Sequence, residues 1–347
     1  MKFRPFLPAL FILAACSSPE PSDTVPVYTV NGEAQGTTYS VKYLNPSGAA
    51  FSAAAIDSVL DEIDRSLSVW VEGSVIARFN AADTIVIDDA HFITVFERGR
   101  ELYELTGGAF NPMVGPLVRA WGFGPEGGEI SEDQDIDALL ALTAFDVKTE
   151  PLQETDGAPT GALRFIKQRE ASLDVNAYAQ GYAVDVVADF LRDRGVTDMM
   201  VEIGGEVYAS GVNGEGAPWR IGVDKPVAPE ETRQLQGAVA LTDAALATSG
   251  TYRKFYRKDG KKYSHTIDPS TGRPVTHNLL SVTVMAPNAL NADALATAFL
   301  VKGTEGTKTF LENHPEMGLE VYLISDDGQG GFETYASSGM EKLFEKF

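Results

Sequence analysis

Apolar residues recur at helical spacing in several stretches of the chain. In residues 53–67, the side chains of Ile56, Leu60, Ile63 and Leu67 fall on one face, which predicts an amphipathic helix. The same spacing, with glycine or proline near the ends, predicts further helices over residues 89–106, 111–121, 177–194, 290–302 and 306–313.

Short apolar runs between turn-forming residues predict strands. They cover residues 27–41 (a strand, a turn around Asn31-Gly32 and Gly36, and a strand), 199–203, 219–223, 238–241, 281–286 and 319–325. Residues 253–258 and 261–267 flank Asp259-Gly260, a two-residue turn typical of a β-hairpin. Helices and hairpins are mixed without regular alternation, which predicts an α+β (mixed α/β) fold.

The amino terminus has the pattern of a signal sequence. Lys2 and Arg4 precede an apolar run that is too short to span a bilayer, which needs ~20 apolar residues. The run ends in Leu-Ala-Ala-Cys, which is typical of a lipoprotein signal in which Cys16 becomes the lipidated first residue; an ordinary signal with a chance cysteine is the alternative. We expect a signal peptide at residues 1–15, lipidated Cys16 with a flexible tether at residues 16–27, and a folded domain at residues 28–347.

Composition narrows the function classes. The formal net charge is −21, and it becomes −23 once Lys2 and Arg4 leave with the signal, which argues against nucleic acid and anionic lipid as partners. A pyrophosphate that enters so acidic a protein needs local cations, and a bound metal is one source. Cys16 is the only cysteine, so the mature fold has no disulfide. About 320 residues suffice for two lobes or one large domain.

The common nucleotide and hydrolase motifs are absent from the sequence. There is no Walker motif, no G-x-G-x-x-G after a strand, no G-x-S-x-G and no H-E-x-x-H. Four scattered histidines and one cysteine argue against a zinc site. Small polar clusters remain as the candidates for chemistry.

Two carboxylates lie beside predicted helices. Asp174 comes just before the helix at residues 177–194, where it could cap the helix or accept hydrogen bonds from a ligand. Asp293 and Thr297 are four residues apart, so they share one helix face and offer the hard oxygen ligands that suit Mg²⁺. A solvated Asp293 and a core-facing Thr297 are the alternative. The carbonyl of Ala177, before the helix closes, could also face a ligand.

Three further features could serve a ligand or a reaction. His265 stands in SHTIDPSTGRPV, before a turn fixed by Pro269 and Gly272, where a structural histidine is the alternative to a catalytic one. Residues 106–117 form a tight glycine turn that leads into a helix, with room for a flat ligand. Trp70 offers a stacking surface, or else it packs in the core.

Taken together, these segments resemble the ApbE family, the FAD:protein FMN transferases. The similarity runs from about residue 35 to near residue 325. It consists of QGTTYSV, LSVWVEGSVIARFN, TGGAFNPMVGPLVRAWGFG, LDVNAYAQGYAVD, VEIGGEVYASG, WRIGVDKP, ATSGTYRKFY, SHTIDPSTGRPV and SVTVMAPNALNADALATAF, in this order. The resemblance implies that residues 28–347 adopt an ApbE-like flavin transferase fold with two lobes around an FAD cleft.

The resemblance also implies roles for individual residues. The metal ligands, for Mg²⁺, fall on the carbonyl of Ala177 and the side chains of Asp293 and Thr297. The residue that assists phosphoryl transfer falls on His265. The FAD contacts fall on Gln35, Trp70, Ala109, Phe110, Asn111, Asp174, Gln180, Ile267 and Ala296. Many members carry Lys at the position of Gln180; a glutamine supplies no positive charge, so we expect strict metal dependence.

The implied activity is Mg²⁺-dependent transfer of FMN from FAD to a Ser or Thr hydroxyl of an acceptor protein, with release of AMP. The implied acceptors are flavoprotein subunits of membrane electron-transfer complexes, reached from the periplasmic side of a bacterial membrane, inner or outer, by a lipid-anchored enzyme. Two alternatives stay open. One is a metal-dependent FAD pyrophosphatase, in which water replaces the acceptor, and the other is a flavin-binding lipoprotein without catalysis.

Overall fold

The computed structural model describes residues 26–45, 48, 50–123, 135–152, 159–227, 232–251, 255–258 and 261–347. The predicted signal peptide and Cys16 lie outside this part, as does the predicted turn at Asp259-Gly260. None of the helices in the described residues is both long enough and apolar enough to cross a bilayer.

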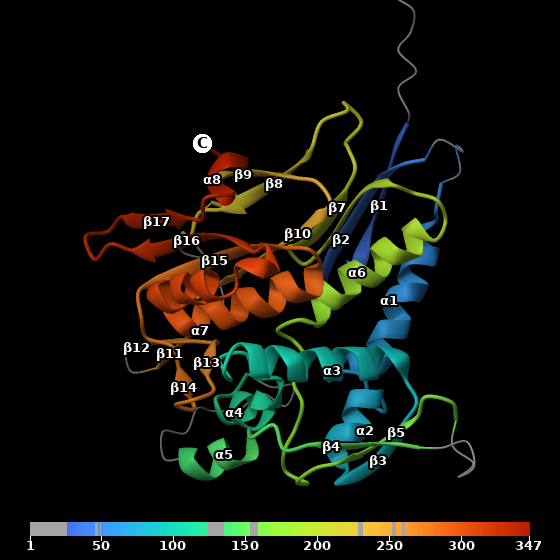
Figure 1. Cartoon of the computed structure of the whole chain (residues 1–347), viewed down its shortest axis with the longest axis vertical. Helices are drawn as coiled ribbons and strands as arrows, with labels where there is room; N and C mark the ends of the chain where they lie inside the picture. Colours follow the sequence, from blue (N-terminus) through green and yellow to red (C-terminus); the bar gives the residue numbers. More distant parts are fainter. Residues whose placement is uncertain are drawn as a thin grey trace, which may run out of the picture.

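An antiparallel eight-stranded sheet dominates the upper part of the molecule (Figure 1). Its first two strands, β1 and β2, form a hairpin, and crossovers bring strands from the middle and the end of the chain beside them. In spatial order the strands are β1 (Val27–Ala34), β2 (Thr37–Leu44), β6 (Asp198–Ile203), β7 (Glu206–Ser210), β10 (Ala244–Gly250), β15 (Leu279–Ala286), β16 (Glu320–Asp326) and β17 (Phe332–Ala336).

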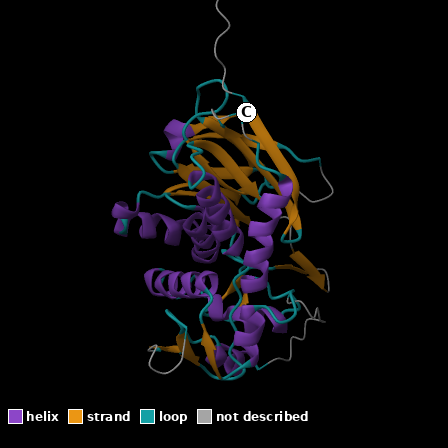
Figure 2. Cartoon of the chain, turned by 90° about the vertical axis from the view of Figure 1, so that its right-hand side faces the viewer, coloured by secondary structure: helices purple, strands orange, loops and turns teal. Residues whose placement is uncertain are grey.

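Helices cover one face of this sheet, as Figure 2 shows from the side. They are α1 (Ala53–Leu67), α6 (Ala179–Arg192) and α7 (Ala289–Asn313). The apolar stripe predicted for α1 is buried, with Ile56, Leu60 and Ile63 each at most 1% exposed. The main hydrophobic core therefore lies between the sheet and these helices.

The opposite face of the sheet carries a smaller layer. It consists of β8 (Trp219–Asp224), β9 (Leu235–Leu241), β18 (Phe344–Lys346) and the short helix α8 (Met340–Leu343). A second apolar cluster, which includes Trp219, Val239 and Ile324, fills the space between this layer and the sheet. This second layer explains why the central strands are buried on both faces and read as nearly continuous apolar runs.

The lower part of the molecule is formed by a second group of helices and strands (Figure 1). They are α2 (Val75–Ala81), β3 (Thr84–Ile87), α3 (Ala90–Leu105), the 3₁₀ helix η1 (Pro112–Val114), α4 (Gly115–Ala120), α5 (Ile136–Leu142), β4 (Lys148–Pro151) and β5 (Leu163–Ile166). A buried group of aromatic rings, including Phe79, Phe92 and Phe165, joins α2, α3 and β5. The remaining elements are β11 (Phe255–Lys258), β12 (Lys261–Ser264), β13 (Ile267–Asp268), β14 (Arg273–Pro274) and the 3₁₀ helix η3 (Pro315–Met317).

Two predicted boundaries differ from the structure, and one predicted break is confirmed. The first hairpin turns at residues 35–36, and Asn31-Gly32 lies inside β1, because Gly32 leaves room for the ring of Tyr39 on the paired strand. The two predicted helices at residues 290–302 and 306–313 form the two halves of α7, which are separated by a kink at Gly303, where φ is 69° and ψ is −178° and neither is helical. The strand predicted to reach residue 267 ends at Ser264, so His265 stands in a bend between β12 and β13.

Candidate active site

One large cavity, of about 1150 Å³, opens between the sheet with its helices and the lower part of the molecule. Its walls come from the β1–β2 turn, the end of α1, the segment around η1, the start of α6, the β6–β7 turn, β10 and α7. All of the predicted metal and FAD residues line it except Ala296, and His265 lines it as well. Segments that are far apart in the sequence thus form one site.

The predicted metal ligands meet where α6 and α7 pack against each other. Asp293 is 7% exposed, and its Oδ2 accepts a hydrogen bond of 3.1 Å from the backbone N–H of Gly181. A Cβ at Gly181 would stand 2.3 Å from the carbonyl oxygen of Ala289, so glycine is required for this close approach. The packing of the two helices therefore sets the position of the Asp293 carboxylate.

Thr297 and Ala177 also line the cavity. The Thr297 hydroxyl lies 3.2 Å from the Ser249 hydroxyl on β10. Ala177 is in the turn just before α6, as the sequence predicted, and its carbonyl is not used in a helix hydrogen bond of that element. The alternative of a solvated Asp293 with a core-facing Thr297 is wrong, because Asp293 is buried and Thr297 lines the cavity.

The surroundings of Asp293 suit a divalent cation. Burial raises the pKa of the Asp293 carboxyl well above its usual range, and the neighbouring carboxylates of Glu206 and Asp185 raise it further, while the Gly181 N–H lowers it. A bound cation would offset both the burial and the repulsion. The donors are all oxygen, which is the set that Mg²⁺ prefers. The described residues hold no cluster of three His, Cys, Asp or Glu side chains suited to a metal, so this set depends on a hydroxyl and a carbonyl.

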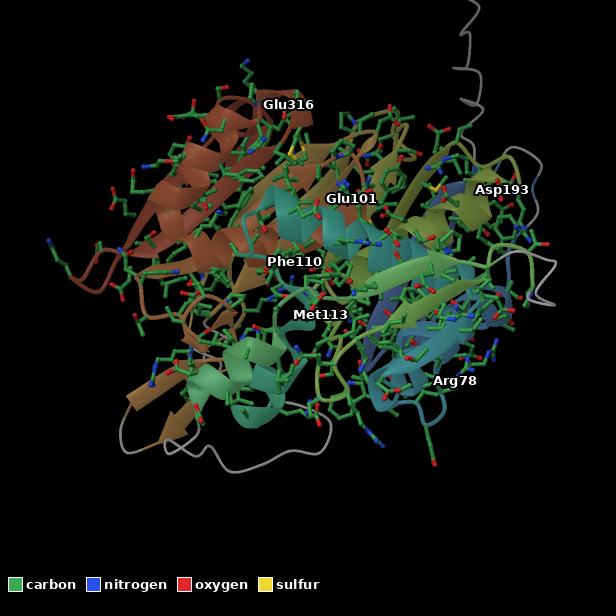
Figure 3. All side chains as sticks on the ribbon, turned by 60° about the horizontal axis from the view of Figure 1, so that its bottom comes forward. Arg78, Glu101, Phe110, Met113, Asp193 and Glu316 are labelled. Carbon is green, nitrogen blue, oxygen red and sulfur yellow. The ribbon has the colours of Figure 1, made fainter. Side chains whose placement is uncertain are left out.

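A second group of candidates surrounds η1. Asn111 caps this 3₁₀ helix by accepting from the Met113 N–H at 2.9 Å and donates to the Thr143 carbonyl at 2.9 Å. Phe110, labelled with Met113 in Figure 3, is 2% exposed and packs edge-on against Tyr178 with ring centroids 5.0 Å apart. These contacts fix the backbone of residues 109–111 at the cavity wall.

Asp174 is held next to this backbone. Its N–H donates to the Pro112 carbonyl at 2.7 Å, and its Oδ1 accepts from the Asn176 N–H at 2.9 Å. Burial raises the pKa of the Asp174 carboxyl. The N-cap residue of α6 is Tyr178, so the capping interpretation of Asp174 is wrong, and Asp174 lines the cavity.

Gln35 occupies the tight turn between β1 and β2. Its backbone has a φ of 54°, a conformation that non-glycine residues rarely adopt. The side-chain Nε2 donates to Asp64 Oδ1 at 3.3 Å, whereas Oε1 is buried without a hydrogen-bond partner in the described part of the chain. A buried acceptor at a strained position next to a cavity is suited to a ligand donor such as an imide N–H.

The remaining candidates surround these groups. Trp70 is 63% exposed and lies at the cavity wall, so the alternative of core packing is wrong. Gln180, in the first turn of α6, packs against Gly204 in the β6–β7 turn. His265 lies edge-on to Phe123, with ring centroids 6.5 Å apart. Ile267 is buried in β13, two residues after His265 and directly before the turn at residues 268–272.

Ala296 differs from the other candidates. It is fully buried within α7 and does not line the cavity, because its side chain points into the core between the helix and the sheet. Its predicted contact with FAD therefore finds no support in the cavity walls.

The structure adds wall residues that sequence reasoning missed. They include Asp64, Phe123, Glu206 and Ser249, of which the last three stand inside matching segments quoted above. Burial raises the pKa of Asp64. No pattern in the sequence distinguishes these residues, because only the fold brings them to the cavity.

The large cavity of this α+β protein combines a buried carboxylate, a hydroxyl and a carbonyl, which are oxygen ligands for a metal, with a strained glutamine and an exposed tryptophan. Such a cavity is suited to bind a large phosphate-bearing aromatic ligand. The chain belongs to the ApbE family, whose model matches residues 35–323. The predicted family and the predicted fold class are thereby confirmed.

Curated relatives and solved structures agree with this assignment. The FAD:protein FMN transferase of Vibrio cholerae is 35% identical and covers 98% of each chain. That of Escherichia coli K12 is 34% identical over 95% of this chain and 93% of its own. The structure of the flavin transferase ApbE from Vibrio cholerae superposes with a TM-score of 0.78 at 34% identity, over 92% of this chain and 99% of that one. The apo form of the Pseudomonas stutzeri flavinyl transferase ApbE gives 0.78 at 33% identity, over 92% and 97%.

Proposed function

We propose that this protein is a FAD:protein FMN transferase, which esterifies FMN from FAD to a Ser or Thr hydroxyl of an acceptor protein and releases AMP. The observation that carries the proposal is the end-to-end similarity to curated transferases, with 98% coverage of both chains in one case. The cavity supports it, because residues quoted from separate matching segments line one space.

FAD is the substrate that this cavity binds. The backbone of residues 109–111, the carboxylate of Asp174 and the buried Oε1 of Gln35 offer hydrogen-bond partners of both kinds to a flavin or a ribose. Trp70 at the wall provides a flat surface for stacking.

Mg²⁺ is the metal that fits the donor set, held by the Ala177 carbonyl, the Asp293 carboxylate and the Thr297 hydroxyl. When bound, it supplies positive charge that neutralises pyrophosphate oxygens and the leaving phosphate. Gly181 and Ser249 orient the side chains of Asp293 and Thr297 through the hydrogen bonds described above.

The transfer step is an in-line displacement at the flavin-side phosphorus of FAD. The acceptor hydroxyl oxygen forms the new P–O bond, the bond to the bridging oxygen of the pyrophosphate breaks, and AMP leaves with that electron pair. His265 at the cavity wall takes the hydroxyl proton. Such a reaction needs positioning and charge neutralisation more than a covalent enzyme intermediate.

The acceptors that we propose are flavoprotein subunits of membrane electron-transfer complexes. A lipid anchor on Cys16 and the polar segment after it would hold the enzyme on the periplasmic side of a bacterial membrane, within reach of such acceptors.

The test incubates the protein with FAD and Mg²⁺, with and without a co-expressed candidate acceptor that has an accessible Ser or Thr. We expect an acceptor mass increased by one FMN, together with AMP in equal amount. Free FMN and AMP at the same rate without acceptor would favour the pyrophosphatase. Tight FAD binding without AMP release, unaffected by Asp293→Ala, would favour a binding protein and overturn the proposal.

A further inference from the structure

Asp174 lies in a segment with no helix or strand of its own. Residues 167–178 connect β5 to α6 without regular hydrogen bonding, yet Ala171, Ser172 and Leu173 are buried. Buried backbone groups outside secondary structure need other partners. Residues 167–173 are here called the Asp174 loop. The hydrogen-bond partners of this loop therefore determine the position of the Asp174 carboxylate.

Asn80, at the end of α2, supplies the two partners closest to Asp174. Its Nδ2 donates to the Leu173 carbonyl at 2.9 Å, and its Oδ1 accepts from the Leu173 N–H at 2.8 Å. One amide side chain thus satisfies both backbone groups of the residue before Asp174, as a neighbouring strand would. Asn80 does not line the cavity, so any effect it has on a ligand must pass through this loop.

Lys167 holds the other end of the loop. Its side chain is buried, and the ammonium group donates to the carbonyls of Ala171 at 2.8 Å, of Gln168 and Arg169 at 3.3 Å, and of Asn80 at 3.4 Å. The same ammonium lies 5.3 Å from the ring centroid of Phe79. A charge buried among carbonyls in this way acts as a fixed cation that gathers the loop backbone around it.

A third contact fixes the opposite side of the loop. Arg119 on α4 donates to the Ser172 hydroxyl at 2.7 Å. Gly115, at the start of α4, lies so close that a Cβ there would stand 2.8 Å from the Ser172 carbonyl oxygen. The loop is therefore held between α2 and α4, with Asp174 directly after it.

We propose that Asn80 and Lys167 are positioning residues for FAD binding, which act by holding the Asp174 loop so that the Asp174 carboxylate faces the substrate. The inference deepens the proposed function and rests on it, because FAD is the ligand whose affinity it sets. Two of the three proposed metal ligands, Asp293 and Thr297, lie on α7, so we expect the loop to affect FAD affinity more than Mg²⁺ affinity.

The experiment measures FAD affinity by flavin fluorescence, with Mg²⁺ present, for the wild type, Asn80→Ala, Asp174→Asn and the double variant. We expect Asn80→Ala to weaken FAD binding about tenfold, the effect of losing one hydrogen bond to a charged or well-placed group. In the Asp174→Asn background, Asn80→Ala should change the affinity by no more than about twofold, since both residues act through one carboxylate.

Asn213→Ala is the matched control. Asn213 ties the β7–β8 loop in the same manner, by accepting from the N–H groups of Glu215 and Ala217 and donating to the Pro218 carbonyl, but it does not line the cavity. It should lower stability and leave FAD affinity unchanged. Steady-state kinetics of Asn80→Ala should show a raised KM for FAD with kcat unchanged at saturation.

Amide hydrogen exchange tests the loop without any ligand. The Leu173 amide should exchange at least about tenfold faster in Asn80→Ala and in Lys167→Met, while the amides of α6 keep their protection. Unchanged FAD affinity in Asn80→Ala, or an equal factor in both backgrounds, overturns the inference. If the wild type binds no FAD, the proposed function is overturned instead. In that case, an unchanged exchange rate of the Leu173 amide in Asn80→Ala still overturns the positioning role.

Discussion

In the absence of a metal, the surroundings of Asp293 disfavour the charged form of its carboxyl group. Burial and two neighbouring carboxylates raise the pKa of this group, and the Gly181 N–H offsets the effect only in part. Removing the charge while keeping the shape should therefore stabilise the metal-free protein. We predict that Asp293→Asn raises the melting temperature without metal and weakens Mg²⁺ binding at least ~100-fold, more than an outer-shell change would.

Calorimetry with and without Mg²⁺ checks this pair of effects. Thr297→Val is the companion variant, because it removes a proposed metal ligand without removing a charge. It should weaken Mg²⁺ binding without stabilising the metal-free protein. A variant Asp293→Asn that is less stable than the wild type at neutral pH would show that the carboxylate has a stabilising partner.

The role that we propose for His265 is proton transfer rather than binding. It lines the cavity in a bend, beside a turn in which Asp268 Oδ1 accepts from the N–H and the hydroxyl of Ser270. We predict that His265→Ala lowers kcat for FMN transfer by ~10²–10⁴-fold. FAD and Mg²⁺ affinities should stay within a few-fold of the wild type. Transfer at the wild-type rate with saturating FAD would remove the base role from His265.

At this scale the sequence predicted the residues with reactive groups but not their environment. Asp293, Thr297 and His265 stand out by residue type and spacing, and the wall of the cavity contains all three. The strained backbone of Gln35, its contact with Asp64 and the hydroxyl of Ser249 near Thr297 depend on pairings across the sheet and between distant helices. Such pairings leave no periodic signal in the sequence.

Among the elements, the start of α7 depends on a carboxylate from α6. Asp185 accepts from the Ala289 N–H at 2.8 Å through Oδ1 and from the Leu290 N–H at 2.9 Å through Oδ2. Burial raises the pKa of Asp185 to about 6 despite these hydrogen bonds, because it outweighs them; Asp189 raises it further and Arg192 lowers it. The element that carries two proposed metal ligands is thus anchored by a titrating group.

The sign of the pH effect follows from the raised pKa. In the folded state Asp185 binds its proton more tightly than in the unfolded chain, so its contribution to stability is full below pH ~4 and is lost as pH rises through about 6. We predict that the free energy of unfolding of the wild type, relative to Asp185→Asn, falls by up to ~3 kcal/mol between pH 4 and pH 7. Urea unfolding of the metal-free proteins at several pH values measures this.

Asp189→Asn provides the comparison for that series, since this residue only repels Asp185 and makes no hydrogen bond to α7. It should lower the pKa of Asp185 slightly and flatten the pH dependence rather than remove it. A stability difference between the wild type and Asp185→Asn that does not vary with pH would mean that Asp185 has an ordinary pKa in the fold.

Long amphipathic elements were the predictable part of the fold. The helix at residues 53–67 has the predicted bounds, and those at residues 89–106 and 177–194 begin and end within two residues of them. Short elements such as α2 and β3 escaped, because four to seven residues hold too few periods to distinguish a helix from a strand. Gly303 separates the two halves of α7, as the sequence predicted.

For the molecule as a whole, the negative net charge gives a reason for the metal that we propose at the site. The chain carries a formal charge of −21, and Asp64, Asp174, Glu206 and Asp293 all line the cavity that we propose binds a dinucleotide. The sequence predicted that an acidic protein would repel a phosphate-bearing ligand, but not where this repulsion acts, since only the fold brings these carboxylates into one cavity. A phosphate-bearing substrate should therefore bind poorly until a cation is present.

Substitution of Gln180 allows the dependence of FAD binding on a cation to be measured. It lines the cavity at the start of α6 and carries no charge. We predict that Gln180→Lys tightens FAD binding without metal about tenfold, because an ammonium can form a charge-assisted hydrogen bond to a phosphate oxygen. The ratio of FAD dissociation constants with EDTA and with Mg²⁺ should then be smaller than in the wild type, by fluorescence titration at fixed ionic strength.

Gln329→Lys distinguishes the effect of a charge inside the cavity on FAD binding from the effect of the net charge of the molecule. Gln329 is exposed in the β16–β17 turn, away from the cavity, so this variant changes the net charge of the molecule by the same amount as Gln180→Lys. Screening over about 10 Å at moderate salt should make a distant lysine ineffective. If both variants lower the ratio equally, the metal relieves the charge of the whole protein. If only Gln180→Lys lowers it, the metal acts on the phosphates within the cavity, as we propose for a cation held by Asp293 and Thr297.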